Sequence, residues 1–119
     1  MKYDLIIYNA RIVTEDEVFL GYMCVSDGKI AVIGGGTSDH EAVRSVDAKG
    51  MLMLPGAIDT HPHFFEPGAE EREDLEHGTR AAASGGFTTV LDMPNTPEHP
   101  VLDPAAFALK RDRAQQEAL

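Results

Sequence analysis

Residues 54–63 read Leu-Pro-Gly-Ala-Ile-Asp-Thr-His-Pro-His, and this stretch marks the point at which the pattern of the chain changes. Before Pro55 the apolar residues fall in short β-type runs, whereas after Gly56 strand-like and helix-like runs alternate. Alternation of strands and helices is typical of a parallel sheet in an α/β protein. We therefore predict an α/β fold with two parts, residues 1–54 and residues 55–119.

The first part, residues 1–54, has an all-β pattern rich in β-branched and aromatic residues. The predicted strands are residues 3–9, 11–13, 18–26 and 29–33. We expect a bend at Asn9-Ala10 between the first two strands. Asp27-Gly28 separates the next two, and this dipeptide adopts positive φ readily enough to form a two-residue hairpin turn.

The second part, residues 55–119, has the order strand, helix, strand, helix. The predicted elements are a strand at 57–61, a helix at 73–84, a strand at 87–93 and a helix that begins at Asp103-Pro104. This order is the opening of a (β/α)₈ barrel, which needs roughly 250 residues when complete. The chain has 119 residues, so we predict only the first two βα units of such a barrel.

His61 and His63 end the first strand of the second part. In a strand, residues two apart point to the same side, so both imidazoles can face one point, and imidazole is a good ligand for Zn²⁺. On spacing alone, the alternative is a pair of ordinary surface histidines. Asp59 lies two residues earlier, where it would either hold a ligand histidine in orientation or pair with a neighbouring loop.

Composition excludes several kinds of partner. Twenty acidic and ten basic residues give a net charge of −10, which opposes binding to nucleic acid and to anionic membranes. Cys24 is the only cysteine, so no disulfide forms within the chain and a reducing compartment is expected. The first apolar run, residues 5–8, is too short for a signal peptide or a membrane span. We therefore predict a cytoplasmic protein.

Several motifs in one order closely resemble the cyclic amidohydrolases, the family that includes dihydroorotase, allantoinase and hydantoinase (dihydropyrimidinase). The motifs are Leu54 to His63, Glu66-Pro67-Gly68, Glu73-Asp74, Gly78 to Ala83 and Gly85 to Thr96. This resemblance implies a (β/α)₈ TIM barrel, with residues 1–54 as the first portion of a small β-sandwich. It implies one or two zinc ions with His61 and His63 as ligands. The other ligands and the general acid/base would lie beyond Leu119, which would leave this chain alone inactive.

The resemblance implies a small cyclic amide as the substrate and a homo-oligomer as the full-length form. The sequences of these motifs are most similar to dihydroorotase, which reversibly opens dihydroorotate in pyrimidine biosynthesis. Asn95 matches the residue with which dihydroorotase contacts the substrate carboxylate. However, Phe65 stands where dihydroorotases usually carry an arginine that binds this carboxylate. Allantoinase and hydantoinase are therefore alternatives, because their substrates lack a carboxylate there. A non-catalytic scaffold homologue is the alternative of another class.

Overall fold

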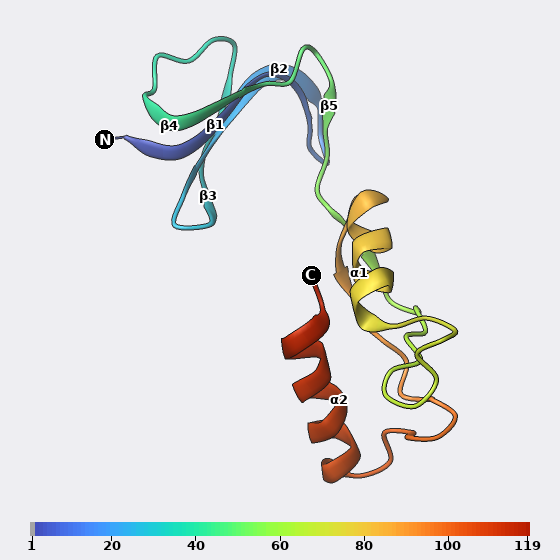
Figure 1. Cartoon of the computed structure of the whole chain (residues 1–119). Helices are drawn as coiled ribbons and strands as arrows, with labels where there is room; N and C mark the ends of the chain where they lie inside the picture. Colours follow the sequence, from blue (N-terminus) through green and yellow to red (C-terminus); the bar gives the residue numbers. More distant parts are fainter. Residues whose placement is uncertain (1) are drawn as a thin grey trace. The chain divides into compact units, whose positions relative to one another are not determined.

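The computed structural model describes residues 2–119 and divides into two compact units, Met1–Pro55 and Gly56–Leu119 (Figure 1). In the first unit the strands are β1 (Tyr3–Val13), β2 (Val18–Ser26), β3 (Lys29–Gly35), β4 (Ala42–Asp47) and β5 (Leu52–Met53). In the second unit the elements are β6 (Ala57–Asp59), α1 (Leu75–Ser84), β7 (Phe87–Val90) and α2 (Pro104–Glu117). The α/β class predicted from the sequence is confirmed.

Strand β1 organises the sheet of the first unit. The sheet has the order β3-β2-β1-β4, with β5 also paired to β1. The sequence predicted two strands with a bend at Asn9-Ala10, but the structure has one strand that continues through a bulge. Asn9 has a φ of 55°, and the register with β2 shifts between Ile7 and Ala10. A bulge bends a strand without ending its pairing, so β1 pairs in parallel with β4 along its first half and with β5 along its second.

The predicted hairpin between β2 and β3 is confirmed. Asp27 and Gly28 have φ values of 52° and 70°, as a two-residue turn with positive φ at both central positions requires. The Asp27 N–H donates to the Asp4 carboxylate at 2.7 Å, which fixes the turn to the start of β1. Strand β3 runs to Gly35, two residues further than predicted.

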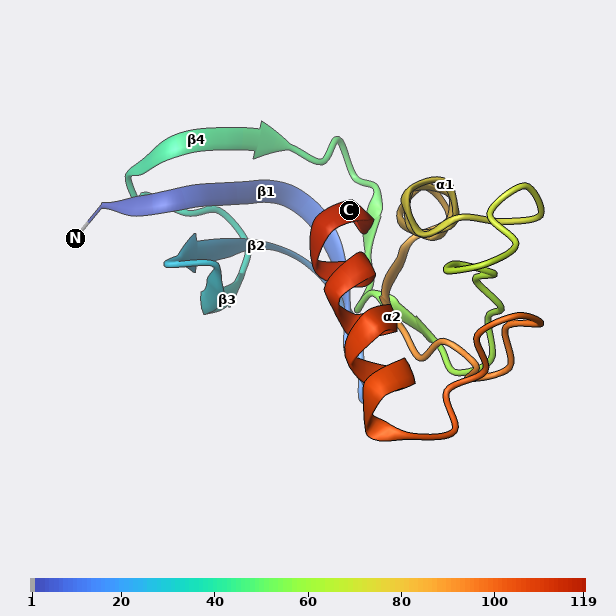
Figure 2. The same ribbon diagram turned by 60° about the horizontal axis from the view of Figure 1, so that its bottom comes forward.

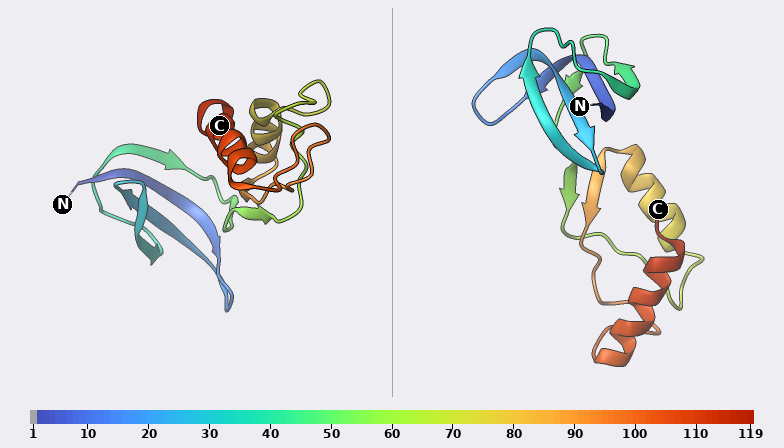
Figure 3. Two further views of the ribbon diagram at one scale, coloured as in Figure 1. Left: turned by 90° about the horizontal axis from the view of Figure 1, so that it is seen from below. Right: turned by 90° about the vertical axis from the view of Figure 1, so that its left-hand side faces the viewer.

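In the second unit, β6 and β7 form a parallel pair, and α1 is the connection between them. Helices α1 and α2 lie side by side on one side of this pair (Figures 2 and 3). The predicted order βαβα is confirmed, but both strands are shorter than predicted. They end at Asp59 and Val90 rather than at residues 61 and 93, because their pairing stops there and Pro62 has no N–H to extend it.

Both helices begin where an aspartate caps the first turn. The Asp74 carboxylate accepts the His77 N–H at 2.6 Å, so α1 starts two residues later than predicted. The Asp103 carboxylate accepts the Ala106 N–H at 2.8 Å, which confirms the predicted start of α2. Within residues 2–119, no helix is long and apolar enough to cross a membrane.

Candidate metal centre

His61 and His63 lie in the chain that leaves β6, beyond the last paired residue. This segment still runs beside the chain that leaves β7. The Leu91 N–H donates to the Asp59 carbonyl at 2.8 Å, and the Met93 N–H donates to the Pro62 carbonyl at 3.0 Å. These two hydrogen bonds continue the alignment of the strands, so the histidines stand at the carboxyl end of a parallel pair, where α/β proteins bind ligands.

The two imidazole rings are close enough to share one metal ion. Their centroids are 5.2 Å apart and their planes meet at 67°. Two imidazoles on one tetrahedral zinc, with Zn–N bonds of about 2.1 Å, have centroids about 5.2 Å apart. The spacing of His61 and His63 therefore fits two ligands of one zinc ion.

Asn95 contacts the second histidine from the loop after β7. Its carboxamide oxygen lies 3.0 Å from Nδ1 of His63. A carboxamide oxygen only accepts hydrogen bonds, so the His63 Nδ1–H is the donor and Nε2 keeps its lone pair. A hydrogen bond on one ring nitrogen that frees the other is the usual arrangement behind metal-binding histidines. The sequence analysis assigned Asn95 to the substrate and missed this contact, which joins residues 32 apart.

Asp59 holds the backbone of residues 61–63, which we call the histidine segment. Its carboxylate accepts the His61 N–H at 3.0 Å. The hydrogen bonds described for residues 2–119 include none from this carboxylate to an imidazole ring. The Asp59 side chain thus shapes the turn from which the first histidine projects, and a direct role in orienting an imidazole ring stays a prediction.

Phe65 lies beside the second histidine, as the sequence spacing predicts. Its ring is nearly parallel to that of His63, with centroids 6.2 Å apart and planes at 17°. The Arg72 guanidinium lies over the same ring, with its carbon 3.8 Å from the centroid. Arg72 comes from the loop before α1, and the sequence analysis gave it no role. A cation therefore stands beside the position at which the sequence lacks the expected arginine.

Glu66 is a buried carboxylate next to this segment, with 2% of its surface exposed. It accepts the Leu75 N–H at 3.0 Å, so it satisfies a free donor at the start of α1. Burial raises the pKa of the Glu66 carboxyl, the Leu75 N–H lowers it, and the neighbouring Glu117 raises it further. The acid-rich sequence from Glu66 to Glu76 predicts a solvated loop and a helix start, and the burial of Glu66 departs from that prediction.

Within the described chain, the candidate metal ligands are the two imidazoles of His61 and His63. Within residues 2–119, no group of three or more His, Cys, Asp or Glu side chains is placed to hold a metal ion. His77 is engaged elsewhere, since its Nδ1 contacts the Asp74 carboxylate at 2.7 Å, and this carboxylate raises the pKa of His77.

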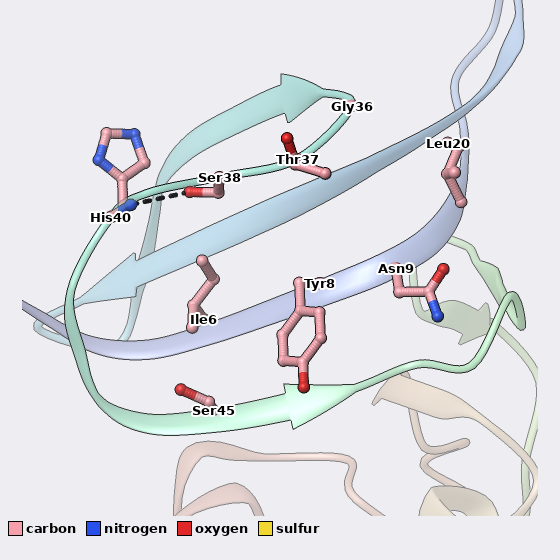
Figure 4. A pocket seen from close by; sticks show the side chains of 9 residues that line it. All are labelled: Ile6, Tyr8, Asn9, Leu20, Gly36, Thr37, Ser38, His40 and Ser45. Carbon is pink, nitrogen blue, oxygen red and sulfur yellow. Dashed lines mark hydrogen bonds between the residues drawn. The ribbon is translucent and has the colours of Figure 1, made fainter.

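One cavity lies on the sheet of the Met1–Pro55 unit, far along the sequence from these histidines. It has a volume of about 440 Å³, and its lining includes Tyr8, Leu20 and His40 (Figure 4). His40 is the only histidine in its lining. A smaller cavity of about 310 Å³ lies beside His63 and is lined also by Asp59 and Glu73. This smaller cavity therefore borders one of the two candidate metal ligands.

Comparison with known proteins shows which family this region resembles. The model of the amidohydrolase family matches residues 52–118. An allantoinase of Escherichia coli O1:K1 / APEC is 43% identical over 115 residues, which are 97% of this chain and 25% of that protein. The chain thus spans about a quarter of the length of the curated relatives it matches.

Solved structures of other proteins also match this chain. The L-hydantoinase (dihydropyrimidinase) of Arthrobacter aurescens matches with a TM-score of 0.89 and 37% identity, over 96% of this chain and 25% of that one. An N-acyl-D-glutamate deacylase of Bordetella bronchiseptica, solved with zinc and a phosphonate inhibitor, matches with a TM-score of 0.60 and 30% identity. It covers 76% of this chain and 18% of that one.

Proposed function

This chain belongs to the amidohydrolase family, and on that basis we propose that the protein is a metal-dependent hydrolase that opens the ring of a cyclic amide. The proposal extends to the architecture. Residues 1–54 form part of a β-sandwich, and residues 55–119 form the first two βα units of a (β/α)₈ barrel. The similarity to a hydantoinase over both parts supports this assignment.

The observation that carries the proposal is the spacing of His61 and His63, with ring centroids 5.2 Å apart. A zinc ion held by both imidazoles would supply Lewis acidity, which activates water near neutral pH and polarises an amide carbonyl. Asn95 fixes the ring of His63 in the tautomer that leaves Nε2 free to bind. We propose that the remaining ligands and the general acid/base come from residues other than 1–119.

We place the substrate among neutral cyclic ureides, such as allantoin and hydantoins. Phe65 is an apolar ring beside His63, and it cannot form the bidentate contact by which an arginine binds a carboxylate. Relatives named allantoinase and L-hydantoinase agree with this choice.

Dihydroorotate is the second candidate, because one observation favours it. The Arg72 guanidinium lies 3.8 Å from the centre of the Phe65 ring, so a cation from the next loop stands near the position of the expected arginine. Dihydroorotase activity therefore stays a prediction, and a substrate panel separates it from the first candidate.

The metal assignment is tested on the full-length protein. We expect stoichiometric zinc, cobalt or manganese in the wild type and a content well below one ion per chain in His61→Ala and His63→Ala. His99→Ala is the matched control, because His99 is an exposed loop histidine. A wild type without bound metal would remove the enzyme proposal and favour a non-catalytic scaffold.

The substrate assignment is tested by hydrolysis of allantoin, 5-substituted hydantoins and dihydroorotate under the same conditions. We expect turnover of allantoin or a hydantoin in preference to dihydroorotate. Turnover of dihydroorotate alone would establish the second candidate and contradict the first.

A further inference from the structure

Behind the histidine segment, an ion pair joins α2 to the chain that leaves β7. Lys110 Nζ lies 2.5 Å from Oδ2 of Asp92, and their side chains are only 12% and 16% exposed. Oδ2 of Asp92 is fully buried and has no hydrogen-bond partner of good geometry in the described residues, so the ammonium group is its only counter-charge there. Neither residue belongs to the predicted metal or substrate site.

The pair holds both polar backbone groups of Phe64, the residue that follows His63. The Phe64 N–H donates to Oδ1 of Asp92 at 2.9 Å. The Lys110 ammonium donates to the Phe64 carbonyl at 3.1 Å. The backbone of this one residue is thus held from both sides by two opposite charges, and charge-assisted hydrogen bonds are about twice as strong as neutral ones.

The same ammonium group also reaches the segment that carries Asn95. Lys110 Nζ lies 3.5 Å from the Met93 carbonyl, and the Met93 N–H donates to the Pro62 carbonyl. The pair therefore ties together the two chain segments whose side chains meet in the contact between His63 and Asn95.

Stability alone gives little reason to keep this pair. Replacement of a buried ion pair by apolar side chains of similar size is often neutral or stabilising, because removing two charges from water is costly. The charges of Asp92 and Lys110 have another use, because they bind the backbone groups of Phe64, next to the candidate ligand His63. We propose that Asp92 and Lys110 are positioning residues that hold His63 in its metal-binding place. This inference rests on the proposed metal site.

The test uses variants of the full-length protein. Lys110→Met removes the ammonium group and leaves a buried carboxylate. The double variant D92L/K110M removes both charges. It therefore leaves no unpaired buried charge that would destabilise the fold. Lys110→Arg keeps the charge and the donors. Arg113→Met is the matched control, because Arg113 lies on the same helix, is exposed and forms an ion pair with Glu117 at 2.9 Å.

The readout is the affinity for Co²⁺, measured by its visible absorption in the metal-free protein. We expect Lys110→Met and D92L/K110M to bind Co²⁺ about 10- to 100-fold more weakly, the range for residues that orient metal ligands, with a changed band shape. Lys110→Arg should recover most of the affinity, and Arg113→Met should equal the wild type. Amide exchange at Phe64 should be faster in the two weakened variants even without metal.

Each result gives a definite answer. A folded D92L/K110M or Lys110→Met that binds Co²⁺ with wild-type affinity and band shape overturns the inference but leaves the metal site standing. Failure of both variants to fold also overturns it, since the pair would then support the fold rather than the ligand. A wild type that binds no Co²⁺ overturns the metal site itself, and the inference with it.

Discussion

The proposed choice of substrate depends on Phe65. The ring of Phe65 is stacked against the ring of His63, and the positively charged guanidinium of Arg72 lies over the Phe65 ring. We predict that Phe65→Arg raises kcat/KM for ring substrates that carry a carboxylate by about tenfold, because a charge-assisted contact contributes about 1.5–3 kcal/mol and Arg72 repels the new cation. Steady-state kinetics with dihydroorotate measure this. Phe107→Arg adds the same charge on α2 as a control, and an equal gain there would contradict the prediction.

Glu66 is expected to make the stability of the protein fall as pH rises. Burial is the main cause that raises the pKa of Glu66 above its ordinary value of 4.5, and Glu117 and Glu70 add to it. A raised pKa means that the folded state holds the proton more tightly. The stabilisation is therefore complete below about pH 4.5 and is lost as pH rises through the folded-state pKa.

Glu66→Gln should reduce this dependence, because glutamine keeps an acceptor for the Leu75 N–H and does not titrate. We expect the free energy of unfolding of the variant to fall less than that of the wild type between pH 4 and pH 7. Urea unfolding at a series of pH values measures it. Glu71→Gln, at an exposed loop position, should leave the wild-type slope. A variant with an unchanged slope would show that Glu66 is not the group responsible.

Helix α1 packs against the histidine segment through a glycine. A Cβ on Gly78 would stand 2.4 Å from a ring carbon of Phe64, which is itself buried. Alanine gains about 1 kcal/mol over glycine in a helix, but overpacking costs about 1–3 kcal/mol where the neighbour cannot move. We therefore predict that Gly78→Ala lowers the free energy of unfolding by up to about 2 kcal/mol. Chemical denaturation checks this, and the double variant with Phe64→Leu should recover part of the loss.

The hairpin of β2 and β3 depends on one glycine for conformational reasons alone. Gly28 has a φ of +70°, and a Cβ there would meet nothing within 4 Å. Gly28→Ala should therefore destabilise by about 1 kcal/mol through the left-handed backbone. Gly35→Ala is the control, since Gly35 lies in β3 without positive φ and its nearest contact is at 3.9 Å. Equal thermal shifts in the two variants would refute the conformational explanation.

At the scale of the whole molecule, the chain has more apolar surface than its own packing covers. Ile58 is 60% exposed and Leu91 is 50% exposed, and within the described residues β6 and β7 pair only with each other. Exposed apolar patches and unpaired strand edges promote association. A polypeptide of residues 1–119 alone should therefore self-associate, and light scattering with a hydrophobic dye measures this. A monodisperse monomer without dye binding would contradict the prediction.

Local chemistry in the sequence was enough for several elements. Asp27-Gly28 predicted its hairpin, and Asp103-Pro104 predicted the start of α2, because turn and cap residues act on their immediate neighbours. The alternation of strand and helix after Pro55 predicted the parallel βαβα order, because such alternation is typical of a parallel sheet. The spacing of His61 and His63 predicted two adjacent imidazoles, although the strand beneath them ends two residues earlier than expected.

The contacts that organise the candidate site depend on residues far apart in the chain, and only the tertiary structure decided them. Asn95 meets His63 across 32 residues, and Lys110 meets Phe64 across 46. No local pattern encodes such a pair, since each arises only once β6, β7 and α2 have packed together. The sequence by itself therefore determined which residues offer chemistry, here two imidazoles at the end of a strand. The fold determined what holds them, because partners far apart in the sequence meet only when the chain packs in three dimensions.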